Sequence, residues 1–179
     1  KTMLAKTLVS LLPPLDSAER LAVTKIHSLA GVLTEQAVTL RPFRSPHHTS
    51  SQISLIGGGA RPRPGEVSLA HHGVLFLDEI PEYPRSVLEA LRQPLEDKTV
   101  SVSRANGRAV YPADFMLVAT MNPCPCGYYG DTAHECTCSS MQIINYQKKL
   151  LGPLLDRIDM VISVTRVPNK QLLHTNTST

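Results

Sequence analysis

Several features that would point away from an ordinary globular fold are missing from this sequence. It has no apolar run approaching the roughly 18 to 20 residues that a transmembrane helix needs, so we expect no membrane span. It also has no internal repeat and no low-complexity linker. A chain of 179 residues, 42% hydrophobic and 18% charged, therefore predicts a single domain with its own buried core. The chain begins with lysine and not methionine, from which we expect a fragment or a processed product.

A secretory signal is also absent. The first twelve residues pair a charged start with an apolar stretch, but they contain no small-residue cleavage site, and their periodicity suits an amphipathic helix. We therefore expect a cytoplasmic, reducing environment. The net charge of +3 is a mild basic bias, which permits a nucleic-acid partner without arguing for one.

The four cysteines are too clustered to form a disulfide framework for a whole domain. Cys124, Cys126, Cys136 and Cys138 form two C-x-C pairs, and such thiols in a reducing compartment point to a metal before a disulfide. Four thiolates can hold a tetrahedral Zn²⁺, with His134 as a possible substitute ligand. A catalytic zinc is not expected, because four thiolates leave no open position. Free buried thiols are the alternative.

Apolar runs bounded by turn residues predict the strands of a parallel sheet. Residues 74–77 and 115–120 are such runs, and strands of this kind are buried on both faces. A last strand is expected near 159–165. Because helical segments alternate with these strands, the sequence predicts an α/β fold.

Local signals predict the remaining elements. Helices are expected at 1–12, from Asp16 or Ser17 to Gly31, at 84–96, and near 139–151. Asn106-Gly107 between two alternating segments predicts a β-hairpin of residues 98–104 and 108–111. Residues 40–66 are dense in Pro, Gly, His and Ser, which predicts a long ordered loop or insert without packed elements.

Two acidic residues, Asp78 and Glu79, directly follow the strand predicted at 74–77. The carboxyl ends of parallel strands form the edge at which α/β proteins bind ligands. Asp78 is suited to hold a hydrated Mg²⁺ ion, and Glu79 to polarise a water molecule for attack on phosphorus. The alternative is a solvated acidic end of a strand.

The Lys1-Thr2 pair opens a predicted helix. In a phosphate-binding loop, lysine contacts the β- and γ-phosphates of ATP and threonine contacts the magnesium ion, at the start of a helix. The glycines that precede this pair in a complete motif are not in the sequence. We expect Lys1, Thr2 and the acids after Leu77 to converge on one nucleotide.

Two further polar residues lie next to predicted strands of the sheet. Asn122 lies just beyond the strand at 115–120, where its amide could orient the attacking water; the alternative is a turn before Pro123. Arg157 lies before the last predicted strand, where it could offset charge on a transferred phosphoryl group in a neighbouring subunit. An ion pair with Asp156 or Asp159 is the alternative.

Two pairs of adjacent histidines, His47-His48 and His71-His72, resemble metal ligands at first sight. Adjacent side chains on a regular element point in different directions. We therefore expect polar contacts in ordered loops and not a metal site.

Several long segments together resemble the magnesium-chelatase-like family of AAA+ ATPases. These are KTMLAK, RPFRSPHHT, Gly57-Gly58-Gly59, RPRPGEVSLAHHGVLFLDEIPEY, LRQPLEDKTVSVSRA, MNPCPCGYYGD and GPLLDRID. The resemblance implies an AAA+ P-loop core over residues 1–168, with a parallel sheet and β-hairpin inserts, followed by a tail at 169–179. The sequence contains neither the Walker A glycines nor the C-terminal lid of this family. The resemblance therefore implies ATP hydrolysis for the parent protein and leaves it open for this segment.

The resemblance also implies roles for individual residues. Lys1 and Thr2 resemble the end of Walker A, Asp78 and Glu79 resemble Walker B, Asn122 resembles sensor 1, and Arg157 resembles the arginine finger. The hairpin at 98–111 resembles the insert before sensor 1, and residues 13–66 cover the region of the helix-2 insert. In this family the inserts line the central channel of a hexamer, where Lys98, Arg104 and Arg108 would contact a DNA backbone.

One branch of this family is associated with DNA remodelling during natural transformation, as hexameric helicases that drive branch migration. Another branch drives magnesium insertion into protoporphyrin. The cysteine loop and the His-His-Thr motif favour the first branch. A chelatase-type ATPase subunit is one alternative, and a non-hydrolysing, zinc-stabilised binding module with an incidental Asp-Glu pair is another.

Overall fold

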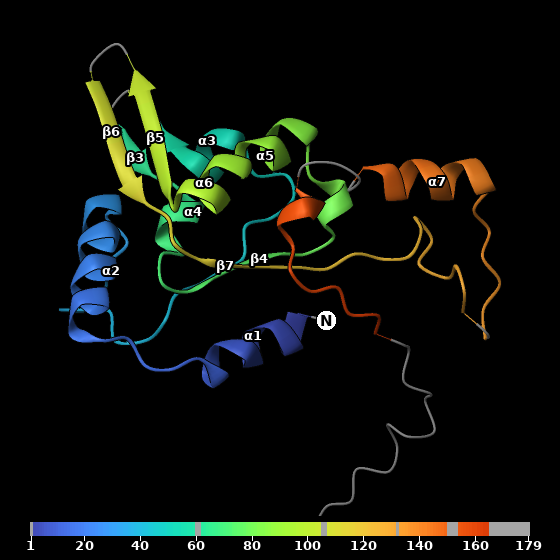
Figure 1. The fold of residues 1–179 in the computed structure, drawn as a ribbon, viewed down its shortest axis with the longest axis horizontal. Coiled ribbons are helices and arrows are strands. Elements are labelled where there is room, and N and C mark those ends of the chain that lie inside the picture. The colour runs from blue at the N-terminus through green and yellow to red at the C-terminus, as the bar shows by residue number, and fades with distance from the viewer. Residues whose placement is uncertain (1, 60–61, 105–106, 132, 150–153, 165–179) are drawn as a thin grey trace, which may run out of the picture.

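A three-stranded parallel sheet forms the centre of the molecule (Figure 1). The computed structural model describes residues 2–59, 62–104, 107–131, 133–149 and 154–164. In the sheet, β4 (Val74–Leu77) lies between β1 (Phe43–Arg44) and β7 (Met116–Ala119). All four residues of β4 are fully buried, which confirms the strand predicted there. β7 is also confirmed as a strand but is only partly covered, because β4 is its one partner among the described strands.

Two N-terminal helices follow their predicted bounds. α1 (Thr2–Leu11) is confirmed, and α2 (Ser17–Ala30) begins after Asp16, whose side chain forms a reciprocal capping box with Glu19. Gly31 ends α2 in the left-handed conformation that glycine adopts at little cost. In Figure 1, α1 lies on one side of the sheet, and α4 to α6 lie on the other.

The prediction of an unpacked loop at 40–66 was wrong. Besides β1, this segment contains α3 (Gln52–Ile56), β2 (Gly57–Gly58) and β3 (Arg63–Pro64), and α4 (Glu66–Leu69) follows. Leu55 of α3 is fully buried in the core. The glycines allow close backbone packing here: a Cβ atom on Gly65 would lie 2.4 Å from the backbone nitrogen of Gly57.

The helix predicted at 84–96 is two helices. After a 3₁₀ turn, η1 (Ile80–Glu82), come α5 (Arg85–Ala90) and α6 (Arg92–Asp97), which break at Leu91. The break has a local cause. Pro94 has no N–H to bond the carbonyl of Ala90, and its ring crowds that carbonyl, so the helical hydrogen bonding is interrupted there.

The predicted hairpin is confirmed and projects from the body of the molecule (Figure 1). It consists of β5 (Thr99–Arg104) and β6 (Gly107–Pro112), paired from Thr99 opposite Pro112 to Arg104 opposite Gly107. Asn106 of the predicted turn, like the tail at 169–179, lies outside the described residues.

The C-terminal part agrees with its predictions only in part. α7 (Ser140–Lys148) is confirmed, with a capping box between Ser139 and Gln142, and the short turn η2 (Leu155–Arg157) follows. The strand predicted at 159–165 is wrong for its described part, because residues 158–164 have no regular structure. Their apolar side chains, Met160, Val161, Ile162 and Val164, are at least 62% exposed. An apolar run forms a buried strand only beside a partner strand, and none of the described strands pairs with it.

The core fills the space between the sheet, α3 to α6 and the base of the hairpin. Its fully buried members include Leu55, Val67, Leu75, Leu77, Leu91 and Val100. Burying a side chain of this size stabilises the fold by roughly 1.5 to 3 kcal/mol. Within the described residues, no helix is both long enough and apolar enough to cross a membrane.

Candidate functional site

The carboxyl ends of β4 and β7 bring two polar residues together. Because Leu77 lies opposite Ala119 in the parallel register, Asp78 and Thr120 follow side by side. The hydroxyl of Thr120 donates a short hydrogen bond to Asp78, and it accepts one from the backbone N–H of Glu79 at 3.2 Å. Sequence reasoning missed Thr120, although a hydroxyl at the end of the predicted strand 115–120 was a usable signal.

Thr2 reaches the same carboxylate from α1. Its Oγ1 donates a hydrogen bond of 3.0 Å to Asp78 Oδ2, although the two residues are 76 positions apart. The hydrogen bonds from Thr120 and Thr2 lower the pKa of Asp78, against the opposing effect of burial. The structure thus brings Thr2 and Asp78 together, whereas Lys1 lies outside the described residues.

Glu79 turns away from the strand that precedes it. Its backbone adopts a left-handed conformation with φ of 51°, and its side chain is exposed. This conformation costs a non-glycine residue about 1 kcal/mol and is common at functional sites. The result is an acidic pair in which Asp78 is held by hydroxyl groups and Glu79 faces solvent.

Tyr83 ties the segment after β1 to this site. Its buried ring lies edge-on to His48, and its hydroxyl donates a hydrogen bond of 2.6 Å to the Pro46 carbonyl. Burial raises the pKa of Tyr83 to about 12, and the charge of Asp78 adds to this effect.

Asn122 lies beyond the end of β7, where two side chains of α7 hold the backbone around it. The hydroxyl of Tyr146, which is buried, faces the Asn122 backbone. Gln147 Nε2 donates one of 3.2 Å to the Pro123 carbonyl. Burial raises the pKa of Tyr146 against the lowering effect of the Asn122 backbone, and the charges of Glu82 and Glu79 contribute to the rise. α7 therefore lies within electrostatic range of the acidic pair.

Arg157 of η2 forms an ion pair with Glu96 of α6. Asp156 and Asp159 were the alternative partners expected from the sequence, whereas Glu96 is distant in sequence. The Arg157 side chain is 24% exposed, so in this chain its guanidinium lies against α6.

The four cysteines converge on one point. All four Sγ atoms lie within 4.8 Å of one another, and three of the separations are 3.4, 3.5 and 3.7 Å. Sulfur atoms at the corners of a tetrahedron with Zn–S bonds of about 2.3 Å are roughly 3.8 Å apart. The cluster could therefore hold a metal ion. His134 is not part of it, and its ring stacks on Tyr128 at 5.0 Å.

Hydrogen bonds within the cluster favour one thiolate over another. The backbone of Tyr128 and the Cys124 thiol lower the pKa of Cys126 to about 6. A backbone hydrogen bond from Cys138 lowers the pKa of Cys136, but burial and the neighbouring thiols together outweigh it and raise this pKa to about 12. A dication would favour the thiolate form of all four, because metal ligands must be deprotonated.

The three basic residues proposed for DNA lie on the hairpin but not in one cluster. Lys98 ends α6 at the base and forms an ion pair of 3.1 Å with Asp114. Arg108 is exposed near the tip, opposite Ser103. Arg104 is placed only by its backbone register opposite Gly107. Along a strand, base and tip are roughly 20 Å apart.

The histidine pairs make polar contacts outside the helices and strands, as predicted, and the two rings of each pair lie close together. The ring centroids are 4.1 Å apart in His47-His48 and 3.8 Å apart in His71-His72. The backbone is irregular at both places; His72, for example, has a φ of 57°. The alternation of side chains along a regular element therefore does not apply. Among the described residues, only the cysteine cluster brings three or more His, Cys, Asp or Glu ligand atoms close together.

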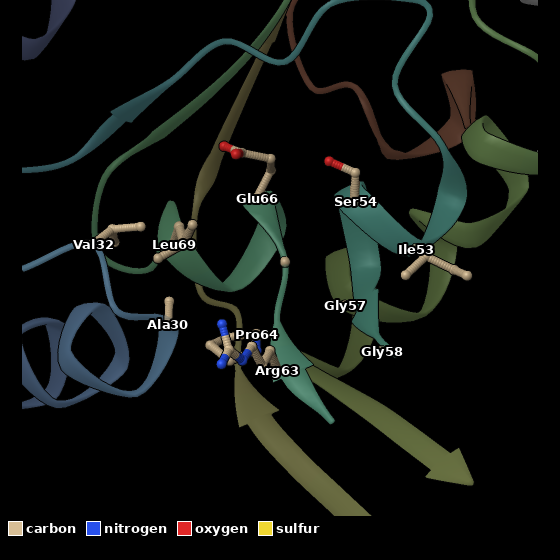
Figure 2. Close-up of a pocket in the computed structure, with 11 residues that line it drawn as sticks. Ala30, Val32, Ile53, Ser54, Gly57, Gly58, Arg63, Pro64, Glu66 and Leu69 are labelled. Carbon is tan, nitrogen blue, oxygen red and sulfur yellow. The ribbon is translucent and has the colours of Figure 1, made fainter. Parts of the chain in front are cut away.

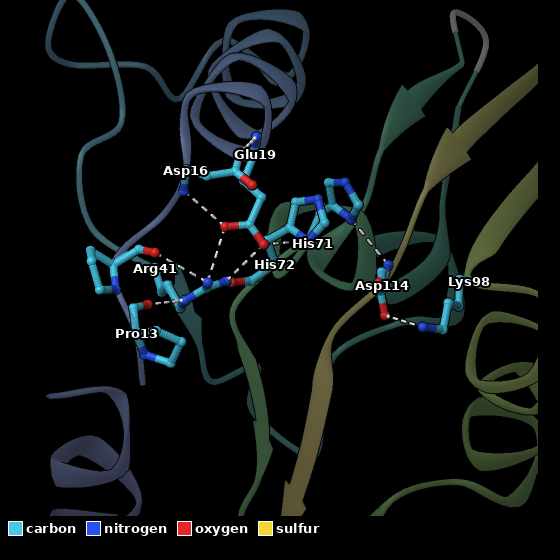
Figure 3. A network of polar contacts seen from close by, with 9 residues as sticks. Pro13, Asp16, Glu19, Arg41, His71, His72, Lys98 and Asp114 are labelled. Carbon is cyan, nitrogen blue, oxygen red and sulfur yellow. Dashed lines mark hydrogen bonds and ion pairs between the residues drawn. The ribbon is translucent and has the colours of Figure 1, made fainter. Parts of the chain in front are cut away.

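The second histidine pair belongs to a polar network shown in Figure 3. His71 Nδ1 accepts a hydrogen bond of 3.0 Å from the Asp114 backbone N–H. Arg41 donates one of 2.7 Å to the His72 carbonyl and forms an ion pair of 3.0 Å with Glu19 of α2. The network thus links α2, the turn before β4 and the base of the hairpin.

A shallow pocket of about 250 Å³ lies between α2, α3, α4 and the β2–β3 pair (Figure 2). Its charged lining residues are Arg63 and Glu66, and Glu66 is already paired with Arg44 at 2.6 Å. No residue predicted for the nucleotide, the metal or DNA lines it. Ligand pockets usually exceed about 300 Å³, so we interpret this one as a packing cleft.

Two curated proteins are similar to almost the whole chain, and a third is similar to a shorter part of it. Competence protein ComM of Haemophilus influenzae is 49% identical over 176 residues, which are 98% of this chain and 34% of that protein. The protein YifB of Salmonella typhimurium is 47% identical over 94% of this chain and 33% of its own length. A magnesium-chelatase 67 kDa subunit of Chlorobaculum parvum is 33% identical over 40% of this chain and 12% of its own length. The chain thus spans about a third of the length of the first two relatives.

Two solved structures are similar to part of the chain. A structure of NtrX from Brucella abortus in complex with ADP covers 51% of this chain and 21% of that chain, with 23% identity and a TM-score of 0.38. Another NtrX structure covers 65% of this chain and 24% of that chain, with 19% identity and a TM-score of 0.42. The family model described as "Magnesium chelatase, subunit ChlI" matches residues 1–172. The chain therefore belongs to the magnesium chelatase family, and its fold is α/β, with a parallel sheet flanked by helices.

Proposed function

We propose that this chain is the catalytic core of a magnesium-dependent ATPase. The observation that carries the proposal is the hydrogen bond of 3.0 Å between Thr2 and Asp78, at the carboxyl edge of a parallel sheet. A hydroxyl and a carboxylate are hard oxygen ligands, and Mg²⁺ prefers one or two of these with water and phosphate oxygens. The donor set therefore fits magnesium bound to ATP. Thr2 and Asp78 would hold the ion, which would neutralise charge on the phosphates.

The remaining site residues have distinct roles in this proposal. Lys1 binds the β- and γ-phosphates, and Glu79 accepts a proton from the attacking water. Asn122 orients that water near the γ-phosphate. Arg157 acts on the nucleotide of a neighbouring subunit in a ring, which requires it to exchange Glu96 for phosphate oxygens.

ATP turnover by the intact protein tests this proposal. Glu79→Gln removes the base and is expected to lower kcat by roughly 100-fold or more while leaving ATP binding intact. Glu82→Gln is the matched control, because Glu82 is also exposed and lies one turn further along. If Glu79→Gln turns over ATP as fast as Glu82→Gln, the assignment of the base is wrong.

We propose further that the protein works on DNA, as a cytoplasmic hexameric helicase that drives branch migration in natural transformation. Support comes from the projecting hairpin with exposed Arg108, and from the similarity to a protein named for competence. A chelatase-type ATPase subunit is the second candidate, supported by the shorter match to a magnesium-chelatase subunit. Stimulation of ATP turnover by DNA favours the helicase, and its absence favours the chelatase.

The cysteine cluster is proposed to bind Zn²⁺ as a structural ion. Soft thiolate ligands in a tetrahedral arrangement favour zinc over magnesium or calcium. A zinc-stabilised binding module without hydrolysis is the remaining alternative. Protein that binds zinc but shows no ATP turnover, alone or with DNA, would support that module.

A further inference from the structure

The cysteine cluster is joined to Asn122 by two separate routes through the structure. The first route is covalent and short, since Asn122 lies two residues before the buried Cys124. The second route starts at Cys138. Ser139 follows it directly and caps α7, and the capping box with Gln142 holds that end of the helix.

α7 completes the second route. Gln147 donates a hydrogen bond of 3.2 Å to the Pro123 carbonyl, and the Tyr146 hydroxyl faces the Asn122 backbone. Tyr146 is 6% exposed and Ile143 is 9% exposed, so this face of α7 is packed. The cluster, the helix and residues 122–124 therefore form a ring of contacts.

This ring has one weak section. Thiols make weak hydrogen bonds, so without a metal the two halves of the cluster, Cys124 with Cys126 and Cys136 with Cys138, are held together only loosely. Residues 120–139 contain no helix or strand in their described part, and turns alone hold a segment of this length poorly. A tetrahedral metal would replace these contacts with four strong bonds.

We propose that a metal ion bound by Cys124, Cys126, Cys136 and Cys138 closes this ring and thereby positions Asn122 at the carboxyl edge of the sheet. Gln147, which bonds the Pro123 carbonyl, and Tyr146, which is packed beside Asn122, are the positioning residues that transmit the constraint from α7. The catalytic consequence rests on the proposed ATPase function, whereas the effect of the metal on the position of Asn122 does not.

Hydrogen–deuterium exchange on the intact protein tests the structural part. Zinc is removed with a chelator and restored, and its content is measured by elemental analysis. Removal is expected to speed amide exchange by roughly tenfold or more in residues 120–124 and 140–148. α2 (Ser17–Ala30) is the internal control, because it packs elsewhere. A protein that binds no zinc, or one in which only residues 124–138 change, would overturn the proposal.

A matched pair of variants tests the role of Tyr146. Tyr146→Phe removes one hydroxyl and is expected to speed exchange at residues 120–124 at unchanged zinc content. Tyr129→Phe is the control, since Tyr129 lies in the same loop with 53% of its surface exposed. Equal exchange in the two variants would show that Tyr146 does not position Asn122.

ATP turnover separates this inference from the proposed function. Tyr146→Phe is expected to lower kcat by roughly tenfold with KM for ATP unchanged, because Thr2 and Asp78 still bind the nucleotide. If the unaltered protein has no turnover, the ATPase proposal fails, and the exchange measurements still decide whether the metal positions Asn122.

Discussion

The ammonium group of Lys98 lies 3.1 Å from the Asp114 carboxylate, and this ion pair joins the two ends of the hairpin. The Ala113 N–H donates to the Lys98 carbonyl at 2.7 Å beside it. Asp114 also accepts a hydrogen bond of 2.6 Å from the His72 N–H and donates to His71. The base of the hairpin is thus bonded to the turn that leads into β4.

This ion pair distinguishes Lys98 from Arg108, although the sequence predicts a DNA contact for both. Arg108→Ala is expected to weaken DNA binding and to reduce the slope of log affinity against log salt by about 1, because it removes one phosphate contact. Lys98→Ala is expected to leave the slope nearly unchanged, since Lys98 is engaged by Asp114. Binding titrations at several salt concentrations measure both, and an equal loss of slope in Lys98→Ala would contradict the distinction.

His71 is expected to make stability depend on pH. Burial, assisted by His72, lowers its pKa from 6.5 to about 4, against the opposing charges of Asp114 and Glu19. Below pH 6.5 the unfolded chain therefore binds a proton that the folded chain accepts only near pH 4. Stability should fall as pH drops through this window, by up to about 1.4 kcal/mol per pH unit.

The variant His71→Asn isolates this effect, because an asparagine oxygen can accept the Asp114 N–H without titrating. Denaturant unfolding between pH 7.5 and pH 4.5 should show a shallower loss of stability in His71→Asn than in the unaltered protein. His47→Asn, at an exposed site, is the control and should lose stability with falling pH as steeply as the unaltered protein. The same slope in all three proteins would contradict the assignment.

Thr120 is expected to stabilise the charged form of Asp78. Thr120→Val removes the hydroxyl between Asp78 and the Glu79 N–H, and should cost about 1 kcal/mol or more at pH 7. Because the folded pKa of Asp78 is lowered, its contribution is present above the unfolded value near pH 4 and is lost as pH falls through the folded value. The cost should therefore be smaller at pH 2 to 3. Thr120→Ser keeps the hydroxyl and should restore stability.

Gly73 is expected to be required for contact between β1 and β4. A Cβ atom there would lie 2.1 Å from the Pro42 carbonyl oxygen, which accepts the Val74 N–H. Gly73→Ala should therefore destabilise the fold by about 3 kcal/mol. Gly31→Ala meets no atom within 4 Å and should cost only about 1 kcal/mol, from its φ of 73°. Similar losses in thermal unfolding would contradict the steric argument.

The cysteine cluster is expected to bind one zinc ion per chain without help from His134. Cys136→Ser should lower zinc content and affinity, because one of the four thiolates is lost. His134→Ala should leave zinc content unchanged, since this ring stacks on Tyr128. Elemental analysis of both variants measures the difference, and zinc loss in His134→Ala would assign a ligand role to the histidine.

Local patterns in the sequence determined much of this fold. The apolar run at Val74–Leu77 identified the buried central strand, Asp16 and Gly31 identified the ends of α2, and Asn106-Gly107 identified the hairpin. These signals were sufficient because each depends on neighbours within a few residues. The order of motifs along the chain likewise singled out Thr2 and Asp78, which the structure then joins.

Tertiary packing decided those elements and contacts that depend on residues distant in sequence. The glycines at 57–65 resemble a loop in the sequence, but they permit close packing of α3 and the β2–β3 pair. The apolar residues 160–164 resemble a strand, but none of the described strands pairs with them, and their side chains are exposed. The sequence also did not predict the partners of the site residues. These are Thr120 for Asp78, Glu96 for Arg157 and Tyr146 for Asn122. A sequence pattern shows which face of an element is apolar, whereas a hydrogen bond or ion pair between remote segments exists only once the chain has brought them together.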